Sequence, residues 1–174
     1  ALPICLGPQD RLRLIAFADA TQAWRSDACT LDATTRASAL AWLCRVQAGG
    51  GTEMRGALEQ AMRGLRVEGQ SQVLLVTDGL VGFEAEVANL LRTRLPASCR
   101  LHVLGVGPAS NRSLSHSVAR AGRGIEAIVG CGEDPRAAAT RLAAHLTAPV
   151  LVDATVRGSA LWGGRSEEHT SELQ

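Results

Sequence analysis

The amino-acid sequence predicts one α/β domain with a doubly wound, mostly parallel sheet that is covered by helices on both faces. Strand-like and helix-like apolar patterns alternate along most of the chain, which is typical of parallel strands joined by helical crossovers. The segment VLLVTDG (73–79) begins as an unbroken apolar run, as expected of a strand that is buried on both faces. With 174 residues, 46% of them hydrophobic, the chain is long enough to form one full core.

The first half of the chain predicts a strand, two helices and a second strand. Residues 11–18 (RLRLIAFA) are rich in apolar side chains and predict the first strand. Residues 34–47 and 53–65 carry apolar side chains at helical intervals, and three glycines separate the two helices. The apolar positions are Ala39, Leu40, Leu43 and Val46 in the first helix, and Met54, Leu58, Met62 and Leu65 in the second. Residues 72–79 (QVLLVTDG) then form a strand that is apolar on both faces.

The second half repeats this alternation of helices and strands. A helix over 83–95 is stopped by Pro96, because proline cannot continue a helix. The following elements are predicted as a strand over 99–107, a helix over 113–122, a short strand over 125–130 and a helix over 134–146. The last of these helices begins with Asp134 as a cap and Pro135 at its first position.

Composition and charge exclude several classes of function. The formal net charge of +1 is spread along the chain without a basic stripe, so a nucleic-acid partner is not expected. No apolar stretch reaches the roughly 20 residues that cross a bilayer, so this segment does not predict direct membrane insertion. The five cysteines stand too far apart for a Cys-x-x-Cys pair and are expected to be small buried hydrophobic residues; they are Cys5, Cys29, Cys44, Cys99 and Cys131.

The end of the chain differs in style from the rest. Residues 1–149 form the expected domain, although only part of it, and residues 150–164 begin the segment that follows. Residues 165–174 (RSEEHTSELQ) contain no Ala or Gly and look like a translated sequencing adapter. No structure is expected for this tail, which is set aside as an expression tag would be.

Two residues are candidates for a binding site. Asp78 ends the strand over 72–79 and precedes a glycine, and Asp-Gly alone is a common turn. Thr52 follows three glycines at the start of a helix, where threonine alone is a common N-cap. Ligands of open α/β sheets bind at the carboxyl ends of the strands, so the two side chains are also expected at one shared edge.

Together these segments resemble the von Willebrand factor A (vWA) domain, and they are most similar to bacterial relatives of the inter-alpha-trypsin inhibitor heavy chains, in which a VIT domain precedes the vWA domain. The resemblance spans nearly all of residues 1–158. It is carried by PQDRLRLIAF (8–17), AGGGTEMRGAL (48–58), LLVTDGLVGFEAEV (74–87), GVGPASNRSL (105–114), ARAGRGIEAIV (119–129) and APVLVDATV (148–156). It implies a Rossmann-like vWA fold that is truncated at its N-terminus, so that the central first strand is missing.

Members of this family hold Mg²⁺ in a metal-ion-dependent adhesion site (MIDAS) built from a D-x-S-x-S loop, a threonine loop and an aspartate loop. By this resemblance Thr52 would bind the metal directly, and Asp78 would bind it directly or through water. The D-x-S-x-S loop is absent, so Mg²⁺ (or Mn²⁺ or Ca²⁺) is expected only in the full-length protein. Residues 19–23 (DATQA) imitate that loop with Asp19 and Thr21, but a turn after a strand is favoured there.

The resemblance implies a metal-ion-dependent protein-binding module of adhesion type, within a larger bacterial protein, and not an enzyme. Its Mg²⁺ would bridge to an acidic side chain of a protein partner. Such proteins suggest an extracytoplasmic or membrane-anchored location, although the sequence itself gives no compartment.

Two other functions remain open. One is the vWA subunit of an ATP-driven chelatase-like complex, which would share the fold and the metal site. The other is a Rossmann-type nucleotide-binding enzyme, although the glycine-rich segments do not fit G-x-G-x-x-G and a chain without lysine cannot have a Gly-Lys-Ser/Thr phosphate loop. The histidines at 102, 116 and 145 are interpreted as structural. Glu84 and Glu86 either line the metal site or, as favoured, form a solvated first helical turn.

Overall fold

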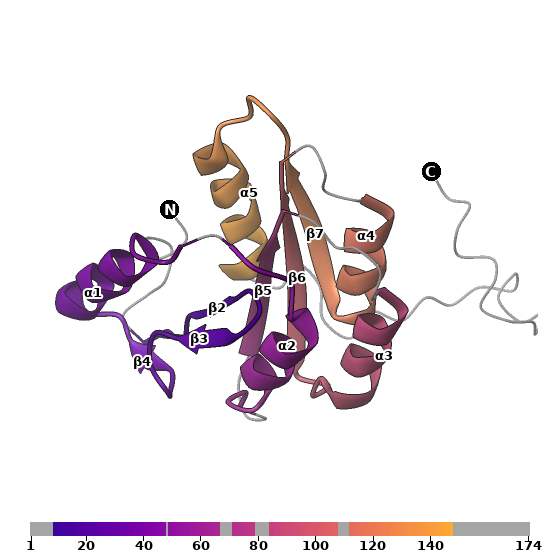
Figure 1. The fold of residues 1–174 in the computed structure, drawn as a ribbon, viewed down its shortest axis with the longest axis horizontal. Helices are drawn as coiled ribbons and strands as arrows, with labels where there is room; N and C mark the ends of the chain where they lie inside the picture. Colours follow the sequence, from indigo (N-terminus) through magenta and orange to yellow (C-terminus); the bar gives the residue numbers. More distant parts are fainter. Residues whose placement is uncertain (1–8, 48, 67–70, 79–83, 108–111, 148–174) are drawn as a thin grey trace, which may run out of the picture.

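The structure is a computed structural model that describes residues 9–47, 49–66, 71–78, 84–107 and 112–147. From Met54 onwards, helices and strands alternate in the order that the sequence predicts, whereas four short strands stand near the start of the described chain (Figure 1). The strands are β1 (Arg11–Leu12), β2 (Ile15–Phe17), β3 (Thr21–Ala23), β4 (Cys29–Thr30), β5 (Ser71–Thr77), β6 (Cys99–Val106) and β7 (Arg123–Val129). The helices are α1 (Ala33–Leu43), α2 (Met54–Met62), α3 (Glu84–Arg94), α4 (Arg112–Ala121) and α5 (Pro135–Thr147).

The main sheet is parallel, and its strand order is β5-β6-β7. Helices α3 and α4 lie on one face and α5 lies on the other, as Figure 1 shows. This confirms the predicted α/β fold with helices on both sides of a parallel sheet. All three strands end at the same edge of the sheet, from which the loops to the following helices leave.

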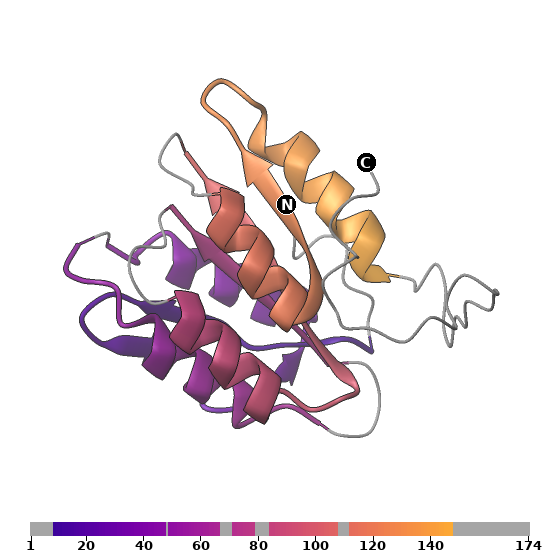
Figure 2. The ribbon, with the colours of Figure 1, turned by 90° about the vertical axis from the view of Figure 1, so that its right-hand side faces the viewer.

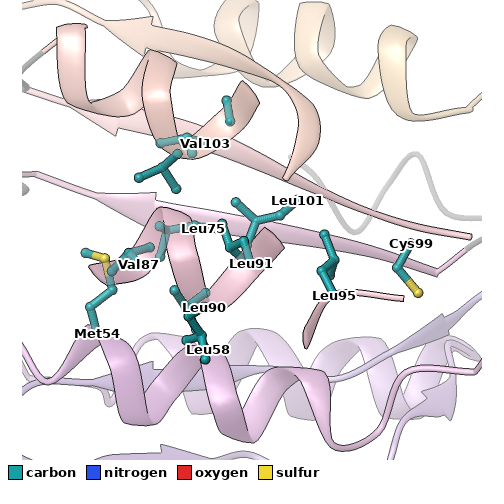
Figure 3. Packing of buried hydrophobic residues seen from close by; sticks show 12 residues of the cluster. Met54, Leu58, Leu75, Val87, Leu90, Leu91, Leu95, Cys99, Leu101 and Val103 are labelled. Carbon is teal, nitrogen blue, oxygen red and sulfur yellow. The ribbon is translucent and has the colours of Figure 1, made fainter. Parts of the chain in front are cut away.

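The larger core lies between this sheet and the helices α2, α3 and α4. Leu101 and Val103 of β6 are fully buried there, together with Leu91 of α3 (Figure 3). The buried members of this cluster are Met54, Leu58, Leu75, Val87, Leu90, Leu91, Leu95, Cys99, Leu101, Val103, Val118 and Ala119. The helical spacing predicted for α2 is confirmed, because Met54 and Leu58 belong to this cluster and Met62 and Leu65 pack against it.

A second core lies on the other face of the sheet, beneath α5. Leu104 of β6 and Val129 of β7 pack there with Ala138 and Leu142 of the helix. Successive side chains of a strand point to opposite faces, which is why Val103 and Leu104 belong to different cores. The predicted cap of α5 is also present, since the Arg136 backbone N–H donates to the Asp134 carboxylate at 2.9 Å.

Two short antiparallel pairs precede the main sheet, and the sequence did not predict their second strands. β2 pairs with β3, and β1 pairs with β4. The strand predicted over 11–18 is therefore divided into β1 and β2. Among the described residues, no strand joins β2 to β5, so β5 is the last strand of the parallel sheet on that side.

Helix α1 packs less closely than its apolar spacing suggested. Only Ala39 is buried in this helix, whereas Leu40 and Leu43 are 45% and 42% exposed. The helix ends at Leu43, so Val46 lies beyond it and is also exposed. The predicted helix is present, but Leu40 and Leu43 are exposed because it projects away from the main sheet (Figure 1).

The prediction that β5 is buried on both faces is also only half correct. Leu75 is buried in the larger core and Leu74 packs against the second one, but Val76 is 47% exposed. In the described residues, α5 covers only part of that face.

An irregularity between β6 and β7 brings two residues into special positions. The register shifts between Leu101 and Val103, and a Cβ on Gly124 would lie 2.6 Å from the carbonyl carbon of Leu101. Only glycine fits there. The preceding residue, Arg123, has a positive φ of 55°, and its guanidinium donates to the carbonyls of Leu95, Pro96 and Cys99. This side chain therefore ties the connection between α3 and β6 to the start of β7.

The cysteines differ partly from expectation. Cys99 is buried and Cys29 is half-buried, but Cys44 and Cys131 are exposed. Cys44 caps α1 at its exposed C-terminal end, and Cys131 lies in the turn after β7, so neither side chain reaches a core. Cys5, the strand-like segment over 150–158 and the tail over 165–174 lie outside the described residues.

Candidate functional site

Asp78 follows β5 directly, at the carboxyl end of the strand. Its side chain is exposed, whereas Thr77 before it is buried. The structure therefore places the carboxylate at the edge where ligands of parallel sheets bind. The residues at 79–83, between Asp78 and α3, are outside the described part of the chain.

Thr52 lies in the loop that leads into α2. Gly50 in this loop has a φ of +85°, a conformation that only glycine adopts easily. The interpretation of Thr52 as an N-cap is wrong: the N-cap of α2 is Glu53, and no side chain caps this helix. The Thr52 carbonyl accepts from the Met54 backbone N–H at 2.8 Å, but its hydroxyl forms no hydrogen bond with any described residue. Thr52 as a whole is exposed.

The start of α2 and the segment around Asp78 approach each other through the larger core. Met54, the first residue of α2, belongs to the same buried cluster as Leu75 of β5 and Val87 of α3 (Figure 3). Figure 2 shows α2 and α3 beginning on the same side of the molecule, where β5 ends. The loop of Thr52 and the end of the Asp78 strand thus lie at the same end of the sheet. No hydrogen bond joins the Thr52 and Asp78 side chains themselves.

An ion pair links the first turns of the two helices. The Arg55 guanidinium contacts the Glu86 carboxylate, and it also lies 3.3 Å from Glu59 one turn further along α2. The hydrogen bond to Glu86, followed by that to Glu59, raises the pKa of Arg55. Glu86 is therefore a partly exposed ion-pair partner in the first turn of α3, in agreement with the favoured solvated interpretation. The side chain of Glu84 is not among those described.

A third residue at this end was not predicted to belong to the site. Asp19 lies in the turn between β2 and β3, as expected, but its carboxylate accepts a hydrogen bond from the backbone N–H of Gly51. The two residues are 32 positions apart in the sequence. The carboxylate also lies against Gly50, where a Cβ would collide with it. The glycines before Thr52 were the one sequence signal for such a close approach.

The donors at this end suit a hard divalent cation only in part. A hydroxyl and a carboxylate are ligands that Mg²⁺ accepts, and Mg²⁺ commonly retains several waters in protein sites. In the described ranges, however, no group of three or more His, Cys, Asp and Glu side chains is placed to hold a metal ion. The two oxygens of Thr52 and Asp78 would be fewer than a complete Mg²⁺ shell needs.

Of the described histidines, His102 has the surroundings of a structural residue, whereas His116 and His145 are exposed. His102 of β6 is buried, and its Nδ1 accepts from the Ile125 backbone N–H at 3.2 Å. Burial lowers the pKa of His102, and the nearby charges of Arg100 and His145 lower it further.

His116 lies on α4, with Nδ1 3.8 Å from the Glu126 carboxylate.

No described helix is long and apolar enough to cross a bilayer.

Comparison with known proteins supports the family and the fold. The sequence profile of the von Willebrand factor type A domain matches residues 4–128. No curated protein sequence matches the chain significantly.

Several solved structures share the fold. A von Willebrand factor type A protein from Catenulispora acidiphila superposes with a TM-score of 0.70 at 21% identity, over 82% of this chain and 34% of that one. The conserved hypothetical protein BatB from Bacteroides thetaiotaomicron gives a TM-score of 0.68 at 18% identity, over 83% of this chain and 81% of that one.

An aerotolerance-related membrane protein from Bacteroides fragilis superposes with a TM-score of 0.59 at 16% identity, over 78% of this chain and 80% of that one. At these identities the similarity concerns the fold alone. The chain spans about a third of the Catenulispora protein.

Proposed function

The chain belongs to the von Willebrand factor type A domain family, whose members are commonly protein-interaction modules, and we propose that it binds a protein partner through a divalent metal ion. Mg²⁺ is the preferred ion, with Mn²⁺ or Ca²⁺ as alternatives. The bound metal supplies an open coordination position for a carboxylate of the partner. Thr52 and Asp78 are the residues of this chain that would hold it.

One observation carries the proposal. The exposed Thr52 hydroxyl, which has no partner among the described residues, and the exposed Asp78 carboxylate lie at the same end of the parallel sheet. The Arg55–Glu86 ion pair and the shared packing of Met54 and Leu75 support this placement. The Thr52 hydroxyl does not cap α2, because Glu53 is the N-cap of that helix. Among the described residues, no ion pair engages the Asp78 carboxylate.

The shared end of the sheet also explains why the two oxygens act together only in the folded protein. Thr52 precedes the N-cap of α2 and Asp78 directly follows β5, so elements that are distant in the sequence position the two residues. A hard cation gains from ligands that are already held near one another, because fewer rotations are lost on binding. The remaining ligands would be water or oxygens of the larger protein.

Titration calorimetry with Mg²⁺ tests the proposal on the full-length protein. We expect saturable binding, and we expect Asp78→Asn to weaken it by about tenfold or more, since even supporting residues of metal sites contribute that much. Asp27→Asn is the matched control, because it makes the same change of charge away from the proposed site. Asp27 follows β3, and this strand runs away from the turn that contains Asp19. Equal Mg²⁺ affinity of the protein and its Asp78→Asn variant would contradict the proposal.

The partner carboxylate has its own test. Acetate is a simple probe, and it should bind only when Mg²⁺ is present. Nucleotide binding that does not depend on a metal would favour the enzyme alternative instead. ATP-dependent assembly with a second protein would favour the chelatase-like alternative.

A further inference from the structure

We propose that Asp19 is a positioning residue that holds the Thr52 loop in place for metal binding. The proposal rests on the proposed function, because it assigns Asp19 a role toward the same site. It does not make Asp19 a ligand.

The residues on both sides of Thr52 are hydrogen-bonded to neighbouring residues of the β2–β3 turn. Before Thr52, the Gly51 backbone N–H donates to the Asp19 carboxylate. After it, the Glu53 backbone N–H donates to the Ala18 carbonyl at 2.8 Å. The backbone of Thr52 is thus held at both ends, while its hydroxyl remains unbonded to the described residues.

The glycines before Thr52 allow this contact. A Cβ on Gly51 would lie 2.7 Å from Oδ1 of Asp19, closer than such contacts can be. A Cβ on Gly50 would come closer still to the carboxylate, and Gly50 also has a positive φ. The pair Gly50–Gly51 therefore forms a place for the Asp19 carboxylate, and a side chain at either position would displace it.

The turn that contains Asp19 is held by its own backbone hydrogen bonds, so the position of Asp19 is defined. The Ala18 backbone N–H donates to the Ala20 carbonyl at 3.1 Å, directly across Asp19. β2 and β3 pair on both sides of this turn. The contact thus joins a fixed hairpin to a glycine-rich loop that has little order of its own.

Two substitutions separate positioning from ligation. In Asp19→Asn the amide oxygen can still accept from the Gly51 N–H, but the charge is lost; Asp19→Ala removes the acceptor as well. We expect Asp19→Ala to weaken Mg²⁺ binding by about tenfold, as for other residues that orient metal ligands, and Asp19→Asn to keep most of the affinity. Gly51→Ala should behave like Asp19→Ala, because its methyl group would displace the carboxylate.

Exchange of the Gly51 amide hydrogen, measured without metal, gives an independent readout. It should be faster in Asp19→Ala than in the unchanged protein, and Asp19→Asn should restore protection. Unchanged Mg²⁺ affinity in Asp19→Ala, or equal losses in Asp19→Asn and Asp19→Ala, would overturn the positioning role while leaving the metal site intact. If the unchanged protein does not bind Mg²⁺, the proposed function itself fails, and the exchange rates still decide whether Asp19 orders the loop.

Discussion

Replacing Leu91 by alanine tests which surfaces of the molecule are packed. Leu91 is fully buried in the core between α3 and the sheet. Removing its outer carbons forfeits about 2.5 kcal/mol of burial. The cavity left behind raises the expected loss in the free energy of unfolding to about 3–5 kcal/mol.

Leu43→Ala is the matched control, because it makes the same chemical change on a helix. Leu43 is 42% exposed at the end of α1 and belongs to neither core. Its replacement should cost about 1 kcal/mol or less. Urea unfolding of the full-length protein, followed by circular dichroism, measures both variants, and the transition midpoint should fall much further for Leu91→Ala.

The result that would refute this reasoning is a similar loss for both variants. In that case the apolar face of α1 would be covered in solution by a part of the protein outside the described residues. A loss below about 1 kcal/mol for Leu91→Ala would contradict the core assignment itself.

Three further predictions test other parts of the fold. Gly124→Ala should lower the melting temperature strongly, because its methyl group would meet the Leu101 backbone, whereas Gly56→Ala, in open space within α2, should raise stability by up to about 1 kcal/mol. The fold lowers the pKa of His102, so as the pH falls the unfolded chain takes up the proton before the folded protein does. The free energy of unfolding should therefore be highest above about pH 6.5 and should fall as the pH drops towards the lowered pKa of the folded state. The urea midpoints of His102→Gln should fall less over the same pH range. Asp32→Ala should reduce helix content by circular dichroism, because Asp32 is the N-cap of α1.

The sequence predicted the fold well where apolar spacing reflects burial. The strands β5, β6 and β7 and the helices α2 to α5 were all expected at their observed places, to within a few residues. Their side chains meet the cores that the spacing implies, as Met54 and Leu58 illustrate. Local signals were sufficient for these elements, because strong periodicity and proline or glycine stops mark them.

Prediction from the sequence failed where the structure depends on contacts between residues that are distant in the sequence. The apolar residues of α1 have helical spacing, but Leu40 and Leu43 are exposed and only Ala39 is buried in this helix. β3 and β4 are too short to have a period of their own. The hydrogen bond between Asp19 and Gly51 joins two loops that are 32 positions apart, so the local sequence of neither loop predicts it. The positions of Thr52 and Asp78 in the chain were clear, whereas their role in metal binding remains a prediction.

The two cores have no residue in common, since the sheet separates them. Changes around Leu142 beneath α5 should therefore add to changes around Leu91 without interacting strongly. The larger core contains Met54 at the start of α2 and Leu75 of β5, whereas the second core meets β5 through Leu74. Redesign of the core beneath α5 that keeps Leu74 should therefore alter thermal tolerance with little effect on the loop that carries Thr52.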